Sequence, residues 1–421
     1  MPQTYGLIIL LFKNRNFLVL WIGQLATIFG NRFSEIAVPL VVLQLTGSPW
    51  KAALIAVCSR VVPLALSLQA GYWVDRHSKK KIAMGADALS FMAMSALVLC
   101  FYFNVLNIWI LAICLLVLGA AGLFYRVSLG AMLPSIVGRD QLVRAHNYIE
   151  GADAVSTLAG PVMAGAALSA LGAAAVLGID AVTYLISLAG LAVLTYKETP
   201  AAAKEREGFK NVLAVKEIKY LFINSYQRFI SFHQAVLNFA SSCVVLAVIF
   251  YTSQTLGFSE WQTGAVLSAA GAGNLLGVFL MNKTVHFSWK SLYGVLMAVS
   301  GLGLLLIMLS GQFAVIACGM FLFDGALSMA FVVNGSARQA ITPDGFLARV
   351  AGGGILLSGL AAVSGTLFAG GIAESFHPLV VIAGCSVLLF LAAAVSLSFK
   401  QGKSRLDKLE PISFRKKMDR I

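Results

Sequence analysis

The sequence is poor in charged residues. Asp, Glu, Lys and Arg make up only 12% of the 421 residues, whereas hydrophobic residues make up 59%. A soluble domain carries about 25% charged residues. The composition therefore excludes an ordinary soluble protein and indicates an integral membrane protein. Short segments of alternating polarity, about ten residues each, are also missing, which excludes an outer-membrane barrel.

The sequence also lacks the patterns that carry most enzyme chemistry. Its six cysteines stand singly inside apolar runs, which excludes a disulfide framework and a zinc site. No phosphate-binding loop, Gly-x-Ser-x-Gly turn or nucleophile–base pattern occurs where it could work. We therefore expect no cofactor and no enzyme activity. Without an ATP site, energy for transport must come from an ion gradient or from the substrate's own gradient.

Acidic residues are scarcer than basic ones, which leaves a net charge of +13. The bases lie in short loops and in the tail at 400–420. Membrane topology explains this placement, so we expect no nucleic-acid partner. No small-residue cleavage site follows the first apolar run, so we also expect no removable signal peptide.

Twelve apolar runs are long enough to cross a bilayer, which takes about 20 residues. They lie at 17–45, 51–71, 82–103, 108–133, 146–170, 174–196, 222–256, 262–282, 289–310, 312–336, 350–373 and 378–399. We predict an all-α membrane protein with six spans in each half. The expected parts are an N-terminal bundle at 1–196, a cytoplasmic linker at 197–221, a C-terminal bundle at 222–399 and a basic cytoplasmic tail at 400–421.

Positive charge is distributed unevenly between the two sets of loops. Alternate connections are rich in Lys and Arg, whereas the others contain Lys51 as their one base. Short basic loops stay in the cytoplasm, so we expect both termini to be cytoplasmic. Five tryptophans at predicted span ends are expected to act as interfacial anchors. They are Trp50, Trp73, Trp109, Trp261 and Trp289.

The two halves repeat short motifs. Ser48-Pro49-Trp50 is followed 211 positions later by Ser259-Glu260-Trp261. The Gly160–Gly165 segment recurs 205 positions later as Gly365–Gly370, and Leu142-Val143-Arg144 recurs at the same offset. These matches predict a parallel repeat related by an axis along the membrane normal. Chance similarity between helices rich in Gly and Ala is the alternative.

The loop between the second and third spans has a specific pattern, Gly71-x-x-x-Asp75-Arg76-x-x-Lys79-Lys80. It resembles the signature of the major facilitator superfamily, although Ser78 replaces the usual glycine. Three further motifs resemble this family. Arg126-x-x-x-Gly130 resembles its proton-coupling motif, Gly160-Pro161-x-x-Ala164-Gly165 its antiporter motif, and Gly23-Gln24-Leu25 with Arg338-Gln339 its macrolide-efflux and enterobactin-exporter branch.

The resemblance implies two six-helix bundles and transport of a small amphipathic molecule, a drug or a siderophore, in exchange for protons. It also implies a monomer in the cytoplasmic membrane of a bacterium. In that setting Gly71, Asp75, Arg76, Lys79 and Lys80 are interpreted as a cytoplasmic latch between the bundles. A charge that only sets the topology is the alternative.

The antiporter-like motif also has a direct physical interpretation. Gly160, Ala164 and Gly165 give the small-xxx-small spacing that lets two helix backbones approach closely, and Pro161 removes one backbone hydrogen bond and favours a bend. Ordinary tight packing is the alternative to a role in transport. Both interpretations predict that bulky substitutions here damage the protein.

Ionisable residues inside membrane spans are costly and are treated as functional candidates. The first half contains most of them: Arg32, Glu35, Arg60, Asp87, Arg126, Glu150, Asp153 and Asp180. Glu35 and Arg60 lie equally far from the turn between their spans, about 18 Å deep at 1.5 Å per residue, so we predict that they pair.

Depth also predicts a second cluster, formed by Arg126, Glu150, Asp153 and Asp87. An acid that alternates between an arginine partner and an apolar setting can carry a proton. We choose Glu35 as the first candidate carrier and Asp153 as the second. Static pairs that tie helices together are the alternative.

Polar residues follow one face of the first and of the seventh span, at helical spacing. In the resembled fold these two helices line the central cavity. The candidate cavity residues are Gln24, Thr27, Asn31, Arg228, Ser231 and Asn238, with Asp324 in the tenth span. Polar contacts between helices are the alternative.

We therefore interpret the chain as a secondary active exporter working by alternating access. Within the transporter class, an uptake permease or a lysolipid flippase is the alternative. A membrane-embedded enzyme and a gradient-independent sensor are the hypotheses outside that class. Transport in vesicles separates these classes, because the possible outcomes are proton-gradient-dependent efflux, gradient-independent movement or no transport.

Overall fold

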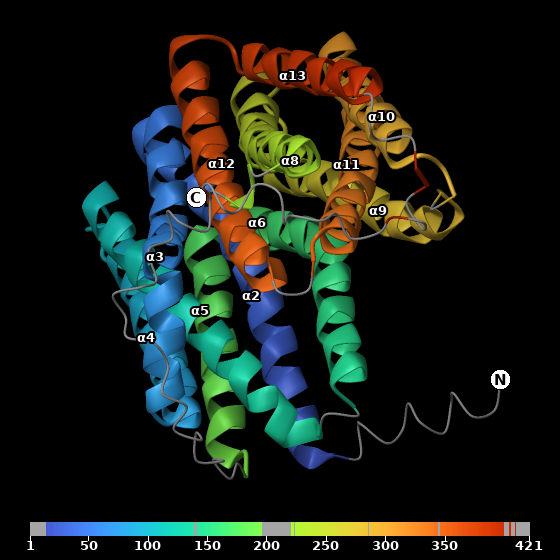
Figure 1. Ribbon diagram of the computed structural model, residues 1–421. Coiled ribbons are helices and arrows are strands. Elements are labelled where there is room, and N and C mark those ends of the chain that lie inside the picture. Colours follow the sequence, from blue (N-terminus) through green and yellow to red (C-terminus); the bar gives the residue numbers. More distant parts are fainter. Residues whose placement is uncertain are drawn as a thin grey trace, which may run out of the picture. The chain divides into compact units, whose positions relative to one another are not determined.

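The computed structural model describes residues 14–138, 141–195, 220–222, 224–284, 286–343, 346–399, 404–405 and 409. Over these ranges the chain forms long α-helices (Figure 1). They are α2 (Arg15–Thr46), α3 (Pro49–Arg76), α4 (Lys79–Tyr102), α5 (Ile108–Val137), α6 (Leu142–Val193), α8 (Ser225–Phe250), α9 (Glu260–Thr284), α10 (Trp289–Leu309), α11 (Phe313–Ile341), α12 (Leu347–Ser375) and α13 (Pro378–Ser398). A π-helical turn, η3 (Tyr251–Thr255), extends α8. The predicted all-α membrane class is confirmed.

Within these ranges, eleven helices are long and apolar enough to cross a membrane. Ten coincide with one predicted span each, and α6 covers the fifth and sixth. Gly172 interrupts α6 with φ 79° and ψ 171°, a conformation that residues with a Cβ rarely adopt. The interruption lies between the two predicted spans, at Gly172 rather than at Pro161. Most of the predicted linker at 197–221 and tail at 400–421 lies outside the described residues.

Local capping chemistry explains where several helices begin and end. The side chain of Asn14 accepts hydrogen bonds from the backbone N–H groups of Asn16 and Phe17 at the start of α2. Asn107 and Asn224 cap α5 and α8 in the same way. Such side chains satisfy backbone donors that a helix start leaves unpaired. Gly47 ends α2 with φ 63°, the left-handed conformation typical of a C-terminal cap.

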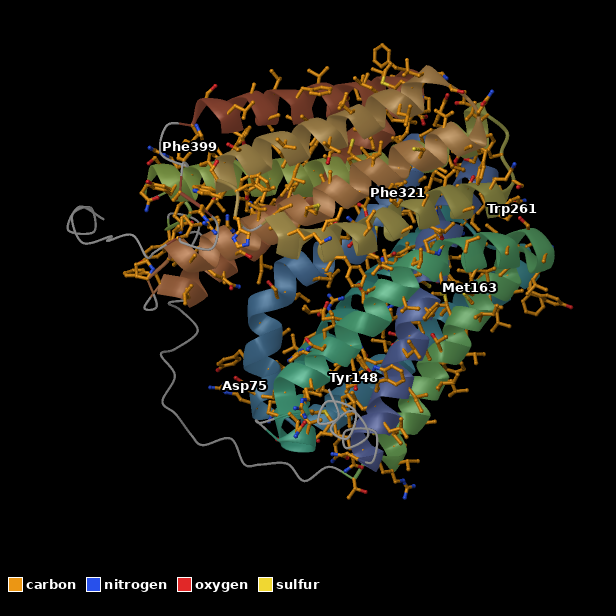
Figure 2. All side chains as sticks on the ribbon, turned by 90° about the vertical axis from the view of Figure 1, so that its right-hand side faces the viewer. Asp75, Tyr148, Met163, Trp261, Phe321 and Phe399 are labelled. Atoms are coloured by element: carbon orange, nitrogen blue, oxygen red, sulfur yellow. The ribbon has the colours of Figure 1, made fainter. Side chains whose placement is uncertain are left out.

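The chain divides into two compact units. Unit 1 comprises Met1–Gly47 and Ile55–Glu207, and unit 2 comprises Ser48–Leu54 and Gly208–Ile421. In unit 1, α2 packs along α6, and α4 packs between α5 and α6. Leu20, Tyr125, Met132 and Leu191 belong to the apolar core where these helices meet. Asp75 and Tyr148 lie at one end of this unit (Figure 2).

In unit 2, α8 packs against α12 and α13, while α11 packs against α9 and α10. An aromatic core includes Trp289, which has no exposed surface and contacts Phe229 and Tyr293 edge to face. The predicted role of Trp289 as an interfacial anchor is therefore wrong. Neighbouring aromatic rings enclose it instead. Trp261 and Phe399 lie at opposite ends of this unit (Figure 2).

Many large apolar side chains face outward. Trp109, Phe279 and Leu309 are 77%, 74% and 79% exposed, respectively. Exposed apolar surface of this extent is unfavourable in water and marks a surface that something else covers. In a chain built of membrane-length helices, the hydrocarbon of the bilayer is that cover. The protein is therefore a multi-pass membrane protein.

Candidate functional site

The most highly charged site in unit 1 is built around Arg32 on α2. Its Nη1 donates to Glu35 Oε2 at 2.9 Å, and its Nη2 donates to Asp153 Oδ1 at 3.1 Å and Thr157 Oγ1 at 3.0 Å. We call these four residues the Arg32 cluster. One guanidinium thus serves two carboxylates, one on its own helix and one on α6. This ties α2 to the first part of α6 through charge.

Small residues on α6 make room for the arginine. A Cβ on Gly160 would lie 2.9 Å from Arg32 Cβ and 3.1 Å from Arg32 Cγ. Glycine at this position therefore lets the aliphatic part of Arg32 lie directly against the α6 backbone. Pro161 and Gly165, the other two residues of the predicted packing motif, are buried in the same segment. The motif is thus placed beside the Arg32 cluster.

A third acid, Asp180, lies close to the cluster, on the far side of the break in α6. Asp180 has no exposed surface, and it accepts hydrogen bonds from the hydroxyls of Ser34 and Thr183. One turn later, the Tyr184 hydroxyl donates to Asn31 Oδ1 at 2.6 Å. Both parts of α6 therefore make polar contacts with one face of α2. The sequence counted Asp180 among the charges inside the spans but gave it no role.

The predicted pair of Glu35 and Arg60 is wrong. Glu35 pairs with Arg32, three residues earlier on the same helix, and Arg60 is exposed on α3. Residues three apart on a helix lie on neighbouring positions of one face. Equal depth in two helices does not place two side chains on facing surfaces, so the local partner prevails.

The second predicted cluster does not assemble either. Asp153 pairs with Arg32, whereas Arg126 and Glu150 are exposed. Asp87 is only 3% exposed and is a hydrogen-bond partner of Ser187. The hydroxyls of Ser187 and Tyr125 lie 3.2 Å apart, so Asp87 belongs to a separate polar group inside unit 1.

The predicted latch loop makes contacts inside unit 1. Lys80 Nζ donates to the carbonyls of Ala192 at 3.1 Å and Leu194 at 2.8 Å, at the C-terminal end of α6. Arg76 stacks on the ring of Tyr72, with its guanidinium carbon 3.8 Å from the ring centroid. Lysine at a helix C-terminus satisfies unpaired carbonyls and interacts favourably with the helix dipole.

The remaining loop residues have simple settings. Ser78 caps α4, with its hydroxyl 3.4 Å from the backbone nitrogen of Lys81 and φ at −62°. This conformation suits serine and does not require the glycine usual in the family. Gly71 faces open space, because a Cβ there would meet no atom within 4 Å. Asp75 and Lys79 are half-buried.

The predicted cavity residues of α2 differ in exposure. Asn31 is exposed. Thr27 is only 5% exposed, and its hydroxyl donates to backbone carbonyls of its own helix. Gln24 is half-buried, and its Oε1 has no hydrogen-bond partner.

The corresponding residues of unit 2 lie on α8 and α11. Arg228 is exposed and Asp324 is half-buried. Ser231 is 1% exposed and donates to the carbonyl of Leu221 at 3.2 Å. Asn238 Nδ2 donates to the carbonyl of Gln234 at 2.8 Å and to Ser358 Oγ at 3.2 Å. Asn238 therefore takes part in a polar contact between α8 and α12.

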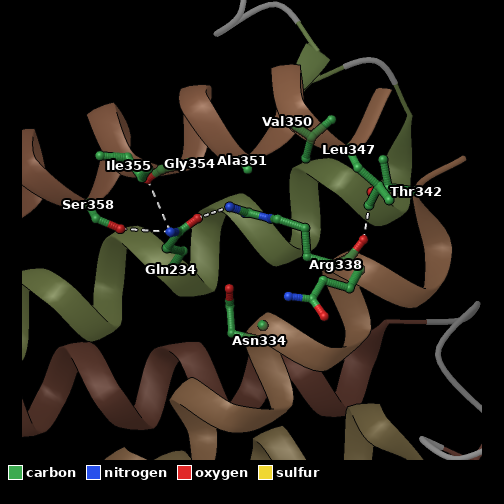
Figure 3. Close-up of a pocket in the computed structure, with 12 residues that line it drawn as sticks. Gln234, Asn334, Arg338, Thr342, Leu347, Val350, Ala351, Gly354, Ile355 and Ser358 are labelled. Atoms are coloured by element: carbon green, nitrogen blue, oxygen red, sulfur yellow. Dashed lines mark hydrogen bonds between the residues drawn. The ribbon is translucent and has the colours of Figure 1, made fainter. Parts of the chain in front are cut away.

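Unit 2 contains a cavity of about 600 Å³ between α8, α11 and α12 (Figure 3). Arg338 lies at its wall and is only 8% exposed. Its guanidinium donates to Gln234 Oε1, and Nη2 also donates to Ser231 Oγ at 3.3 Å. Gln234 in turn donates to Ser358 Oγ at 2.7 Å. A cavity of this size is typical of small-molecule sites.

The sequence indicated Arg338 only through the motif Arg338-Gln339, beyond the end of the predicted span at 312–336, and this site was missed. A signal was present, because Asn334, Arg338 and Thr342 recur at intervals of four. This spacing places three polar side chains on one helix face. In the described part of the chain, no group of three His, Cys, Asp or Glu residues could hold a metal ion.

The model of the Major Facilitator Superfamily matches residues 20–366. The chain belongs to this superfamily. Solved structures share its fold. They include a bacterial homologue of the human lysosomal transporter Spinster (TM-score 0.72, 13% identity, 93% of this chain and 98% of that one) and the nucleoside transporter NupG (TM-score 0.75, 13% identity, 91% and 100%).

Among curated superfamily members, the chain is similar to efflux proteins. Macrolide efflux protein A of Streptococcus pyogenes is 24% identical over 178 residues, which is 42% of this chain and 44% of that protein. The multidrug efflux pump Tap of Mycolicibacterium fortuitum is 25% identical over 265 residues, which is 59% and 62%. The matches thus span about half of these relatives. The superfamily and its fold are those of transporters rather than enzymes.

Proposed function

We propose that the chain is a secondary active exporter of a small amphipathic molecule, driven by protons moving inward. The support comes from the superfamily, from relatives that are named as macrolide and multidrug efflux proteins, and from the geometry of the Arg32 cluster. Alternating access of the two six-helix bundles, 1–196 and 222–399, provides the mechanism.

The observation that carries the proton-coupling proposal is one arginine shared by two acids. The side chain of Arg32 is 27% exposed, and those of Glu35 and Asp153 are 58% and 50% exposed. When one acid takes up a proton, the other still neutralises the guanidinium, so protonation leaves no uncompensated charge among apolar helices. The cluster can therefore bind and release a proton without being dismantled.

Glu35 is the preferred proton carrier and Asp153 the second. Glu35 is the more exposed acid, and its salt bridge to Arg32 lies within one helix turn. Asp153 shares the other side of the guanidinium with Thr157 and ties two helices together. Loss of the Glu35 charge therefore changes coupling with less effect on packing than loss of the Asp153 charge.

The decisive experiment uses purified protein in liposomes, with a macrolide or a fluorescent cationic dye as the probe. Wild-type protein is expected to move the probe against its gradient when a proton gradient is imposed. Glu35→Gln keeps the size of the side chain and removes its charge. Proton-driven transport by this variant should fall about tenfold or more, which corresponds to about 1.4 kcal/mol.

The matched control is Glu260→Gln, which removes a carboxylate from the first turn of α9 in unit 2. This variant should transport at the wild-type rate. Transport by Glu35→Gln that stays fully driven by a proton gradient would exclude Glu35 as the carrier. Movement of the probe that ignores the gradient in wild-type protein would exclude proton antiport.

The remaining features of the proposal concern setting and regulation. We place the chain as a monomer in the cytoplasmic membrane of a bacterium, with both termini in the cytoplasm. Asp75 and Arg76 are proposed as a cytoplasmic latch that acts during the transport cycle. The uneven distribution of basic loops supports this orientation.

A further inference from the structure

The arginine in the unit 2 cavity lacks the partner that a buried cation needs. Arg338 is 8% exposed, and its Nε is buried without a hydrogen-bond partner among the described residues. The two side chains that accept hydrogen bonds from its guanidinium, Gln234 and Ser231, are neutral. Across the described ranges, no carboxylate forms an ion pair with this guanidinium. This contrasts with Arg32, which has two carboxylates.

A buried charge without a counter-charge is unfavourable by several kcal/mol, so such a residue marks a functional site by default. A guanidinium has five N–H donors arranged in a planar fork. Gln234 and Ser231 account for only part of them. The remaining donors match two oxygens of a carboxylate or phosphate better than any other group.

Neighbouring polar groups leave the arginine as the main unsatisfied donor. Gln234 Nε2 is used by the carbonyl of Gly354 at 3.1 Å and by Ser358 Oγ. Asn334 Nδ2 donates to the carbonyl of Ile230 at 2.9 Å, and the Thr342 hydroxyl donates to the carbonyl of Arg338 at 2.6 Å. The cavity therefore offers one strong positive group among neutral ones. Of the polar side chains that line it, Gln234, Asn334 and Thr342 are already engaged as donors, and Gln339 is uncharged.

Aliphatic side chains also line the cavity. Leu347, Val350 and Ile355 lie on α12, the helix that also carries Gly354 and Ser358 (Figure 3). A cavity with one fixed cation and aliphatic side chains in its lining suits a molecule with an acidic head and an apolar body. A small hydrophilic anion would leave the aliphatic side chains without contacts.

We propose that the unit 2 cavity binds the oxyanion head of an amphipathic ligand, a carboxylate or a phosphate, through Arg338. Gln234 and Ser358 position the guanidinium from α8 and α12. The ligand is either a free molecule or an anionic lipid. This site goes beyond the proposed function, because its residues belong to unit 2 whereas the Arg32 cluster belongs to unit 1.

The test measures binding to purified protein in nanodiscs of neutral phosphatidylcholine, by equilibrium dialysis. The probes are octanoate and octyl phosphate, with 1-octanol as the uncharged probe and empty nanodiscs as the correction for partitioning. Both anions should bind saturably, whereas 1-octanol should bind about tenfold more weakly or not at all. Repetition in phosphatidylglycerol nanodiscs identifies the source. Weaker probe binding there means that a lipid headgroup competes for Arg338, and unchanged binding means that the site takes free anions.

Three variants test the role of Arg338. Arg338→Gln should weaken binding of both anions about tenfold or more, and Arg338→Lys should retain part of it because the charge remains without the planar fork. Gly354→Ala keeps the charge but adds a Cβ that would meet Arg338 Nη1, so it should weaken binding by shifting the guanidinium. Lys283→Gln removes an exposed charge of α9 and is the matched control, with wild-type affinity expected.

The proposal is overturned if Arg338→Gln and Gly354→Ala bind octanoate and octyl phosphate as wild-type protein does, or if 1-octanol binds as tightly as the anions. Thermal unfolding of each variant shows whether it is folded. If Arg338→Gln fails to fold, Gly354→Ala and Arg338→Lys still decide the question. Normal anion binding in a protein that fails to transport any probe would refute the exporter proposal and leave this one intact.

Discussion

Each unit contains a contact between two corresponding helices, α2 with α6 in unit 1 and α8 with α12 in unit 2, and we call each contact a seam. The two seams share a backbone arrangement but differ in their side-chain chemistry. In unit 1, α2 meets α6 through Arg32, which donates to Asp153. In unit 2, α8 meets α12 through Gln234 and Asn238, which donate to Ser358. Asp153 and Ser358 are 205 positions apart, the same offset that separates Gly160 from Gly365. The same helix position thus carries an acid in one unit and a hydroxyl in the other.

The settings of Arg32 and Arg338 follow from this difference. Where the seam is charged, Arg32 is neutralised within it. Where the seam is neutral, Arg338 on α11 lies at a cavity and contacts neutral groups. A repeated backbone therefore supports two kinds of site, one closed around its own acids and one available to a ligand.

The turn before the third helix of each unit is repeated more faithfully. Ser78 caps α4 and Ser288 caps α10, each through its own hydroxyl. Two residues later, Lys80 donates to carbonyls at the end of α6, and Lys290 donates to the carbonyls of Leu397 and Phe399 at the end of α13. The loop at 71–81 therefore has a structural counterpart in unit 2, which retains the caps without the Asp75-Arg76 pair.

Exchange of glycine for alanine at the two seams should have the largest effect on stability, and a larger one in unit 2. A Cβ on Gly365 would collide with the backbone carbonyl of Phe239, whereas one on Gly160 would meet the side chain of Arg32. A backbone cannot turn aside as a side chain does, so Gly365→Ala should destabilise by about 1–3 kcal/mol and Gly160→Ala by less. Thermal unfolding of the purified variants measures this order.

Transport should respond in the opposite order, because Gly160→Ala displaces Arg32 whereas Gly365→Ala does not touch it. Gly151→Ala and Gly384→Ala are the matched controls, since a Cβ at either position would meet no atom within 4 Å. Equal destabilisation by Gly160→Ala and Gly365→Ala would contradict this prediction. It would mean that both seams adapt equally well to an added methyl group.

Exchanging Asp153 and Ser358 tests whether the charge at the unit 1 seam couples transport to protons. Asp153→Ser gives unit 1 the side chain found in unit 2 and leaves Arg32 with Glu35 alone. Proton-driven transport in liposomes should fall about tenfold, a barrier increase of about 1.4 kcal/mol. Ser358→Asp gives unit 2 an acid next to Gln234, and adding it to Asp153→Ser should not restore transport. Restoration by the double variant would show that the units are interchangeable.

Much of the fold follows from the sequence because a membrane span is a local property. A run of about 20 apolar residues is a helix in hydrocarbon, where every backbone hydrogen bond must be made within the segment. Capping residues such as Asn107 and Asn224 then mark helix starts. The break at Gly172 follows in the same way, since glycine accepts φ 79°. None of these features depends on which helix faces which.

The sites are harder to predict because they depend on the faces that helices turn toward each other. Glu35 and Arg60 have equal depth, but Arg60 is exposed and Glu35 pairs along its own helix. Trp289 lies at a span end, yet the neighbouring aromatic rings enclose it. Composition and spacing identify which residues are unusual, whereas packing decides which of them meet.

The paired lysines separate a capping role from a latch role. Lys80→Met and Lys290→Met each remove two hydrogen bonds to carbonyls at a helix end, so each should destabilise by about 1 kcal/mol. If the loop of unit 1 also acts as a latch, Lys80→Met should slow transport more than Lys290→Met at equal stability. Thermal unfolding and liposome transport together give the two readings. Equal transport rates would restrict Lys80 to capping.

The smallest effects are expected when the serines that cap the third helix of each unit are replaced with glycine. Ser78→Gly and Ser288→Gly should cost only a few tenths of a kcal/mol, because glycine is itself tolerated at a helix start. Ser78→Ala and Ser288→Ala should cost about 0.5–2 kcal/mol, because alanine leaves a backbone donor unpaired without glycine's freedom. Thermal unfolding of the four variants tests this order. A large loss of stability in Ser78→Gly but not in Ser288→Gly would mean that the Ser78 hydroxyl does more than cap α4. The two turns would then differ in their roles, although their hydrogen bonds are alike.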